Sequence, residues 1–135
     1  MAKMMKAVVD LLNDPEASKV LATADVVGIL NVVPKGTLAA VDEETLVFGD
    51  IMGDKTNANL KNNNRVAVAV FKIQMPPVGY QVKGTFQGFQ TSGPVFDKVS
   101  KQVKQALNLD IRSIGLIRVD EVYSAAPPNP GARLA

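Results

Sequence analysis

A polar segment, GDIMGDKTNANLKNNNR at residues 49–65, lies between two apolar segments. It places Lys55 and Thr56 just after a glycine turn, where a helix is expected to begin with Asp54 or Thr56 as its N-cap. An ammonium, a hydroxyl and the free N–H groups of a helix start all suit a phosphate. The segment therefore indicates either anion binding or a polar turn between strands in which Lys55 is solvated.

The spacing of Gly49 and Lys55 also matches the nucleotide-binding P-loop, GxxxxGK[ST]. However, the second glycine is displaced to Gly53, and Asp54 would turn a carboxylate toward the phosphates that such a loop wraps. A nucleotide-phosphate enzyme is therefore a minor alternative.

Composition restricts the remaining chemistry. At 135 residues, the chain is expected to form one domain over residues 1–135. The absence of histidine and cysteine removes the usual general base, the thiolate nucleophile and the commonest metal ligands, so no metal site is expected. The net charge of +2 is small and few aromatic residues accompany the lysines, which argues against a nucleic-acid partner. With no spanning apolar run and no signal segment, we expect a cytoplasmic protein without a membrane partner.

The elements that must hold the polar segment are a helix and then short strands. Residues 4–12 show the apolar spacing of a helix, and four short apolar segments follow from Lys19. RVAVAVFK, residues 65–72, is apolar on both faces, so we expect it at the centre of a sheet and covered on both sides.

The second half of the chain continues this pattern. Residues 79–90 alternate apolar and polar, and Gly84 and Gly88 fall in the apolar row, where they predict bulges that curl the sheet toward a barrel. A helix with an apolar stripe begins at Pro94, and a last strand over residues 114–119 leads into a proline-rich tail. The order predicts a mainly β protein with flanking helices and a closed or nearly closed barrel.

Residues 48–71 resemble the cofactor segment of the split-barrel FMN-binding proteins, the superfamily that includes pyridoxamine 5′-phosphate oxidase. In that family a small-residue turn precedes a Lys/Arg-Thr/Ser pair, an Asn-Leu pair on a short helix and an apolar strand. This chain supplies KT at 55–56, NL at 59–60 and RV at 65–66 in that order. The similarity extends from the strand at Leu21 to the C-terminal tail.

The resemblance implies a split β-barrel of antiparallel Greek-key strands that binds FMN. It implies that Lys55 and Thr56 hold the phosphate, and that Asn59 reaches a ribityl hydroxyl or locks the loop. The flavin ring would meet two further segments. The implied cofactor-binding residues are Val32, Val33, Pro34, Lys35, Gly49, Asp50, Ile51, Met52, Lys55, Thr56 and Asn59.

Two of these residues have an alternative interpretation. Lys35 is either a cation beside the pyrimidine edge of the flavin, where it would favour the anionic reduced form, or a solvent-facing turn lysine. Met52 either contacts the ring or fills a gap in the core.

The function that the resemblance implies is an FMN-dependent oxidoreductase that transfers electrons or a hydride to an unknown small molecule. The alternative is an FMN-binding electron carrier or storage module without its own substrate. The flavin would carry the redox chemistry, and no catalytic side chain is identified. The chain is shorter than the pyridoxamine phosphate oxidases and lacks their basic C-terminal segment, which argues against that specific activity.

Family members are usually dimers, so the resemblance also implies a homodimer with FMN sites at its interface. A small molecule or a redox protein would be the further partner. Gln81 and Tyr123 are candidates for residues that one subunit donates to the other.

Overall fold

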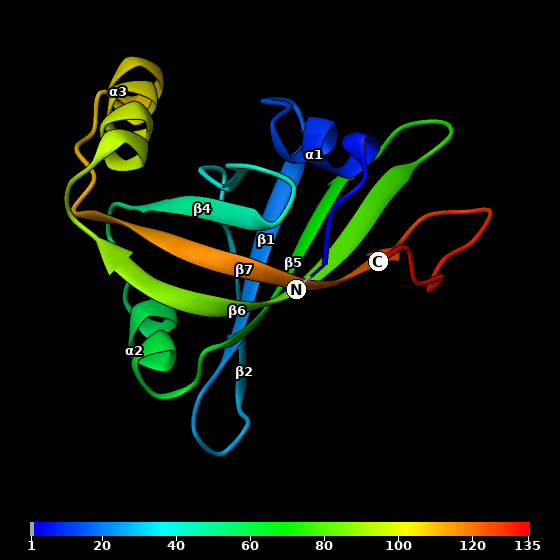
Figure 1. The fold of residues 1–135 in the computed structure, drawn as a ribbon, viewed down its shortest axis with the longest axis horizontal. Helices are drawn as coiled ribbons and strands as arrows, with labels where there is room; N and C mark the ends of the chain where they lie inside the picture. Colours follow the sequence, from blue (N-terminus) through cyan, green and yellow to red (C-terminus); the bar gives the residue numbers. More distant parts are fainter. Residues whose placement is uncertain (1) are drawn as a thin grey trace.

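A curled antiparallel sheet is the centre of the molecule (Figure 1). The computed structural model describes residues 2–135, and across them the sheet has seven strands in the order β2-β1-β5-β6-β7-β4-β3. The strands are β1 (Ser18–Ala24), β2 (Leu30–Pro34), β3 (Ala39–Ala40), β4 (Thr45–Asp50), β5 (Arg65–Lys72), β6 (Val78–Gln90) and β7 (Ser113–Ser124). The helices are α1 (Lys6–Leu12), α2 (Lys55–Asn62) and α3 (Pro94–Leu107). This half-barrel with flanking helices confirms the expected split-barrel fold.

Strand β6 bends where two glycines stand. Its pairing with β7 shifts register between Lys83 and Gly84 and again between Phe86 and Gly88, which confirms the predicted bulges. A Cβ atom at position 84 would lie 2.5 Å from the backbone oxygen of Arg118, so the strands can approach this closely only at a glycine. The bends let β6 and β7 wrap around the core.

Strand β6 is the central strand of the sheet, and it pairs along its length with both β5 and β7. Strand β5, which was predicted at the centre, lies next to it. Val66, Val68 and Val70 are buried in the core, whereas Ala67 and Ala69 on the opposite face stay partly exposed. The prediction that both faces of β5 are covered is therefore correct only for the face that carries the valines. Within residues 2–135, no helix packs over the face that carries the alanines.

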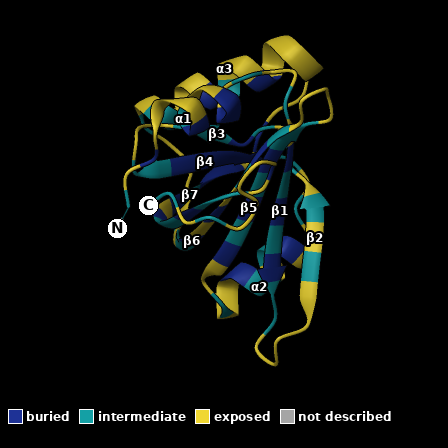
Figure 2. Cartoon of the chain, turned by 90° about the vertical axis from the view of Figure 1, so that its right-hand side faces the viewer, coloured by how far each residue is buried: buried dark blue, intermediate teal, exposed yellow. Residues whose placement is uncertain are grey.

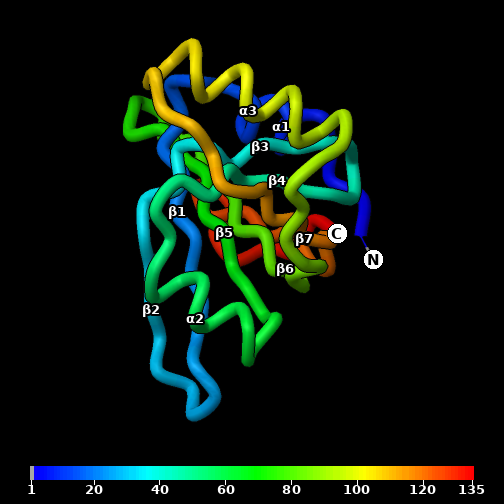
Figure 3. Tube along the Cα trace, turned by 90° about the vertical axis from the view of Figure 1, so that its left-hand side faces the viewer, coloured from blue at the N-terminus to red at the C-terminus, as the bar shows by residue number. Residues whose placement is uncertain are grey.

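Two helices cover one end of the sheet and one covers the other end. Figures 2 and 3 show α1 and α3 on the side of β3 and β4, and α2 near the opposite end of β1 and β2. Val99 and Val103 of α3 pack in a small apolar cluster with β4 and β7, but Leu107, the end of the predicted stripe, is 55% exposed. Helix α1 begins at Lys6 rather than Met4, because Met5 at the N-cap has an extended backbone with a φ of −66° and a ψ of 155°.

Strand β7 is longer than predicted and anchors both ends of the described chain. The Ala2 N–H donates to the carbonyl of Val119, and the Leu134 N–H donates to that of Val122. The proline-rich tail thus folds back onto β7. No helix in residues 2–135 has the length and apolar character needed to cross a membrane.

The bulge at Gly84 gives a test of the curled sheet. We expect Gly84→Ala to lower the free energy of unfolding by about 1–3 kcal/mol, because the added methyl group meets backbone that cannot move away cheaply. Gly36→Ala is the control, since a Cβ there has no neighbour within 4 Å. Urea unfolding of both variants measures the difference, and equal stabilities would contradict the role given to Gly84.

Candidate functional site

A cavity of about 1140 Å³ opens between α1, α3, the start of α2 and the segment that joins β2 to β4. Of the residues predicted from the sequence to hold a cofactor, it brings together Val33, Pro34, Lys35, Gly49, Ile51, Met52 and Thr56. Val32, Asp50, Lys55 and Asn59 do not line it. The cavity is mostly apolar, and its polar residues are spread over its walls. They are Asn13, Lys19, Lys35, Thr37, Thr56, Lys98 and Gln102.

Strand alternation explains why Val33 lines the cavity and Val32 does not. Successive side chains of a strand point to opposite faces. Val32 is 65% exposed and lies opposite Ala22 of β1 on the face away from the core. The resemblance identified the segment but not the face, so a side-chain contact of Val32 with a ligand in this cavity is not expected.

Helix α2 presents Thr56 to the cavity. Thr56 is 4% exposed, and its Oγ1 accepts a hydrogen bond of 3.1 Å from the Asn31 side chain on β2. Asp54 occupies the N-cap position, but its side chain makes no capping hydrogen bond. The first N–H groups of α2 therefore lack a side-chain cap, as an anion-binding helix start requires.

A second side chain fastens α2 to the sheet. The Asn59 amide donates to Thr23 Oγ1 of β1 at 3.0 Å. This contact ties α2 to β1, and both roles considered for Asn59 stay predictions. Lys55 is exposed at the first position of α2, and its role as the phosphate cation stays a prediction.

Lys35 and Met52 differ in burial. Lys35 is partly buried, and its Nζ lies 5.1 Å from the centre of the Phe48 ring, which is the geometry of a cation–π contact. Burial lowers the pKa of Lys35 from its ordinary value, although the charge of Asp50 opposes this. Lys35 therefore belongs to the cavity wall rather than to a solvated turn. Met52 is 81% exposed at the rim, so it does not fill a gap in the core.

The carboxylate of Asp50 faces away from the cavity and holds the adjacent turn. It accepts hydrogen bonds from the Gly53 N–H at 2.8 Å and the Asn57 amide at 2.9 Å, and it pairs with the Arg112 guanidinium at 3.2 Å. Burial alone would raise the pKa of Asp50, but these donors outweigh it and lower that pKa. Asp50 therefore supports the site from behind.

Sequence reasoning missed Arg112 and Asn57, the partners of Asp50. Arg112 also donates to the Gly53 carbonyl at 2.9 Å, which closes the turn from the far side. An acid and a base so far apart in the sequence carry no local signal of their pairing.

The position of Gly53 follows from the same contacts. A Cβ atom there would lie 2.4 Å from Asn57 Oδ1, a buried atom with no hydrogen-bond partner in residues 2–135. The glycine therefore leaves room for the Asn57 side chain. Strand β4 also pairs antiparallel with both β3 and β7, so the strand–loop–helix unit of a P-loop is not embedded in a parallel sheet.

Comparison with known proteins gives one family and several similar folds. The family model for pyridoxamine 5′-phosphate oxidase matches residues 4–125. HupZ of Group A Streptococcus is 22% identical over 98% of this chain and 99% of that chain, with a TM-score of 0.82. An FMN-binding protein from Syntrophomonas wolfei subsp. wolfei is 20% identical over 87% of this chain and 83% of that chain, with a TM-score of 0.80. HutZ, the heme storage protein from Vibrio cholerae, is 10% identical over 93% of this chain and 97% of that chain, with a TM-score of 0.66. No curated protein matches the sequence.

The contacts of Asp50 predict a pH-dependent loss of stability. At neutral pH, Asp50→Asn should lower the free energy of unfolding by about 1.5–3 kcal/mol, the scale of hydrogen bonds to a charged group. Folding lowers the pKa of Asp50. The stability that its carboxylate contributes is therefore fully present above its unfolded pKa of about 3.9, and it is lost as the pH falls through its lower pKa in the folded state. The difference from wild type should therefore shrink below about pH 4.

Chemical denaturation between neutral and acidic pH measures this difference. Asp54→Asn removes a charge from an exposed neighbour without a capping bond and is the matched control. A constant difference across the whole pH range would show that the Asp50 charge has no such role.

Proposed function

The chain belongs to the pyridoxamine 5′-phosphate oxidase family, and we propose that it is an FMN-binding flavoprotein that transfers electrons or a hydride to or from a small molecule. The observation that carries the proposal is the cavity wall, which combines apolar segments with the Thr56 hydroxyl and the Lys35 ammonium. FMN has matching parts, a flat apolar ring system and an anionic phosphate. The similar fold of an FMN-binding protein from Syntrophomonas wolfei supports the same conclusion.

The phosphate would be held at the start of α2. Thr56 supplies a buried hydroxyl, the first turn of the helix supplies N–H groups, and Lys55 supplies a positive charge at the same end. The contacts from Asn31 and Asn59 hold α2 against β1 and β2, so these donors are in place before a ligand arrives.

The ring system would lie on the apolar wall formed by Val33, Pro34 and Ile51. When bound, the flavin supplies the redox chemistry. Lys35 would place a positive charge next to the ring, which favours the reduced anionic form, and the cavity walls would exclude water. A chain without histidine or cysteine is compatible with this division of roles.

Haem is the competing ligand, because HutZ is described as a heme storage protein. Histidine and cysteine are common axial ligands of haem iron in proteins. The chain has neither residue, so the donor set favours a flavin over haem.

A homodimer is the assembly that the sheet supports. We call the exposed side of β2, β1 and β5 the outer face; its residues are Leu30, Val32, Val20, Ala22, Ala24, Ala67 and Ala69. These side chains are small or apolar, and those of β2 are exposed. An exposed apolar surface of this kind suits a second copy of the chain.

Polar residues border the outer face on β6 and β7. Gln81 lies opposite Ala69 on one side and opposite Tyr123 on the other, and Lys83 Nζ lies 5.3 Å from the centre of the Tyr123 ring. In a dimer formed through the outer face, this border would lie at the interface. Gln81 and Tyr123 are therefore the residues that one subunit would contribute to the other.

Flavin binding tests the proposed function directly. Purified protein should show the absorbance of a bound flavin, or acquire it on addition of FMN. Lys55→Ala should weaken FMN binding by about 1.5–3 kcal/mol because it removes a charge-assisted contact to the phosphate. Fluorescence titration with FMN measures the affinity, and Lys61→Ala, on the same helix, is the control. Protein that takes up no FMN would rule the proposal out.

The outer face gives a separate test. Val32→Glu places a charge on an exposed position of β2 and should convert the dimer to monomers without loss of the monomer fold. Sedimentation velocity measures the mass of each species. Ile73→Glu, at an exposed position outside the outer face, should leave the dimer intact. A wild-type protein that sediments as a monomer at all concentrations would refute the dimer.

A further inference from the structure

Two lysines stand opposite each other where β1 and β2 meet the cavity. Val20 of β1 pairs with Pro34 of β2, and the Lys35 N–H donates to the Lys19 carbonyl at 2.9 Å, so Lys19 and Lys35 are the next pair in this register. Both line the cavity. Two lysine side chains on one cavity wall attract an anionic counter-charge.

The protein itself does not supply that counter-charge. Lys98 also lines the cavity, and no carboxylate among the described residues does. The acids that act on the two lysines from a distance are engaged elsewhere: Asp14 pairs with Lys72 at 2.5 Å, and Asp50 pairs with Arg112. The cavity is therefore a positively charged site without an internal anion.

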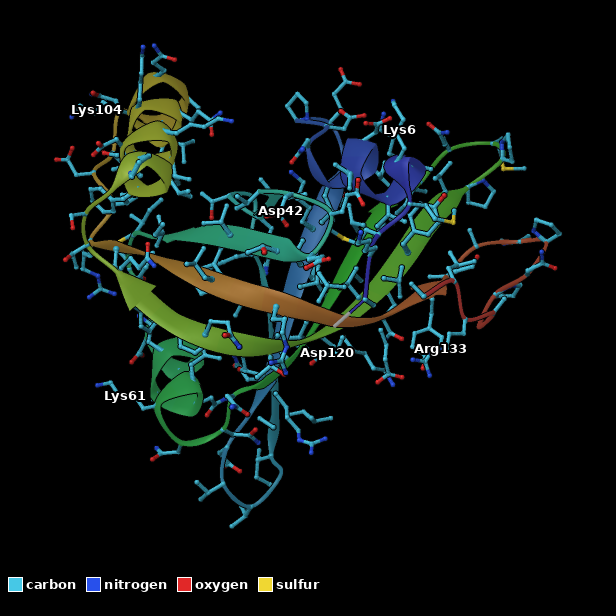
Figure 4. The ribbon with its side chains drawn as sticks, viewed as in Figure 1. Lys6, Asp42, Lys61, Lys104, Asp120 and Arg133 are labelled. Carbon is cyan, nitrogen blue, oxygen red and sulfur yellow. The ribbon has the colours of Figure 1, made fainter. Side chains whose placement is uncertain are left out.

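Lys19 differs from the surface lysines of this protein. Figure 4 shows Lys6, Lys61 and Lys104 on the outer sides of the helices, and all three are exposed. Lys19 is only 8% exposed, and burial lowers its pKa from the ordinary value.

The ammonium of Lys19 has hydrogen-bonding capacity to spare. Its Nζ donates to the Leu38 carbonyl at 2.9 Å, and an ammonium has three donors. A buried cation is costly unless acceptors surround it. The remaining donors of Lys19 therefore favour an anion in the cavity.

The cavity walls near Lys19 indicate the chemical character of the rest of the ligand. Figure 1 shows α1 and α3 standing apart on the same side of β4, and the cavity extends between them. Its lining there is mainly apolar, and Asn13, Lys98 and Gln102 are its polar members. The apolar residues are Leu12, Pro15, Ala39, Ala40, Val99, Val103, Ala106 and Leu107. A ligand that fills this end needs one anionic group and an apolar body.

We propose that this end of the cavity is a subsite for an apolar small-molecule carboxylate, whose carboxylate accepts hydrogen bonds from Lys19 while its apolar body lies between α1 and α3. The subsite rests on the proposed function in one respect: it assumes that a flavin binds next to it, at Lys35. The ligand of the flavoprotein is then an apolar organic acid, held next to the ring.

Octanoate and octan-1-ol are probes that differ in the anionic group but share an apolar chain. Isothermal titration of the flavin-loaded and flavin-free protein should show octanoate binding at least tenfold more tightly than octanol. Lys19→Met should remove this preference, because it replaces the ammonium with an apolar group of similar length. Lys101→Met, an exposed residue of α3 outside the cavity lining, makes the same charge change and should preserve it.

Two further measurements keep the subsite testable if Lys19→Met does not fold. Ala106→Trp, at an exposed position of the groove wall, should lower octanoate affinity about tenfold by occupying the groove, with flavin content unchanged. Equal binding of octanoate and octanol by wild-type protein, or an unchanged preference in folded Lys19→Met, would overturn the subsite. Protein that prefers octanoate but takes up no FMN would support the subsite and refute the flavin assignment.

Discussion

The carboxylate of Asp50 fixes the geometry of the turn between β4 and α2. It gathers donors from the turn itself, from the first residues of α2 and from Arg112 next to β7. Because the carboxylate is buried and each donor neutralises part of its charge, the turn has little freedom to move. The start of α2, and with it Thr56, is thereby held against the cavity. The donors proposed to bind a phosphate depend on a charge that never faces the ligand.

The two faces of β1, β2 and β5 have separate tasks because their side chains alternate. The inner face carries Leu21, Val66 and Val68 into the core and Lys19 into the cavity. The outer face is left with alanines and exposed apolar residues that no helix of residues 2–135 covers. The alternation of side chains between the two faces of these strands therefore produces the core, the cavity and the surface proposed for the dimer. A shift of register by one residue in β2 would exchange Val33 with Val32 and destroy the cavity wall.

Local sequence signals predicted the features that depend on neighbouring residues. Gly84 and Gly88 predicted the bulges because glycine inside a strand commonly marks a bulge or a bend, and Pro94 marked the start of α3. Long-range pairs left no such signal. The contact between Asp50 and Arg112 and the pairing of Lys19 with Lys35 arise only when strands and turns come together. The resemblance identified residues 32–35 as one segment, but only the strand register separates Val33, which lines the cavity, from Val32, which does not.

Lys19 links stability to binding. Burying its ammonium removes it from water, which costs free energy in the folded chain, and burial lowers its pKa although Asp14 opposes this from a distance. A fold selected for stability alone would have an apolar residue at position 19, like the neighbouring buried residue Leu21. An anion bound to Lys19 would recover part of that energy and would stabilise the folded state by mass action. The charge at Lys19 is therefore better explained by a ligand than by the fold.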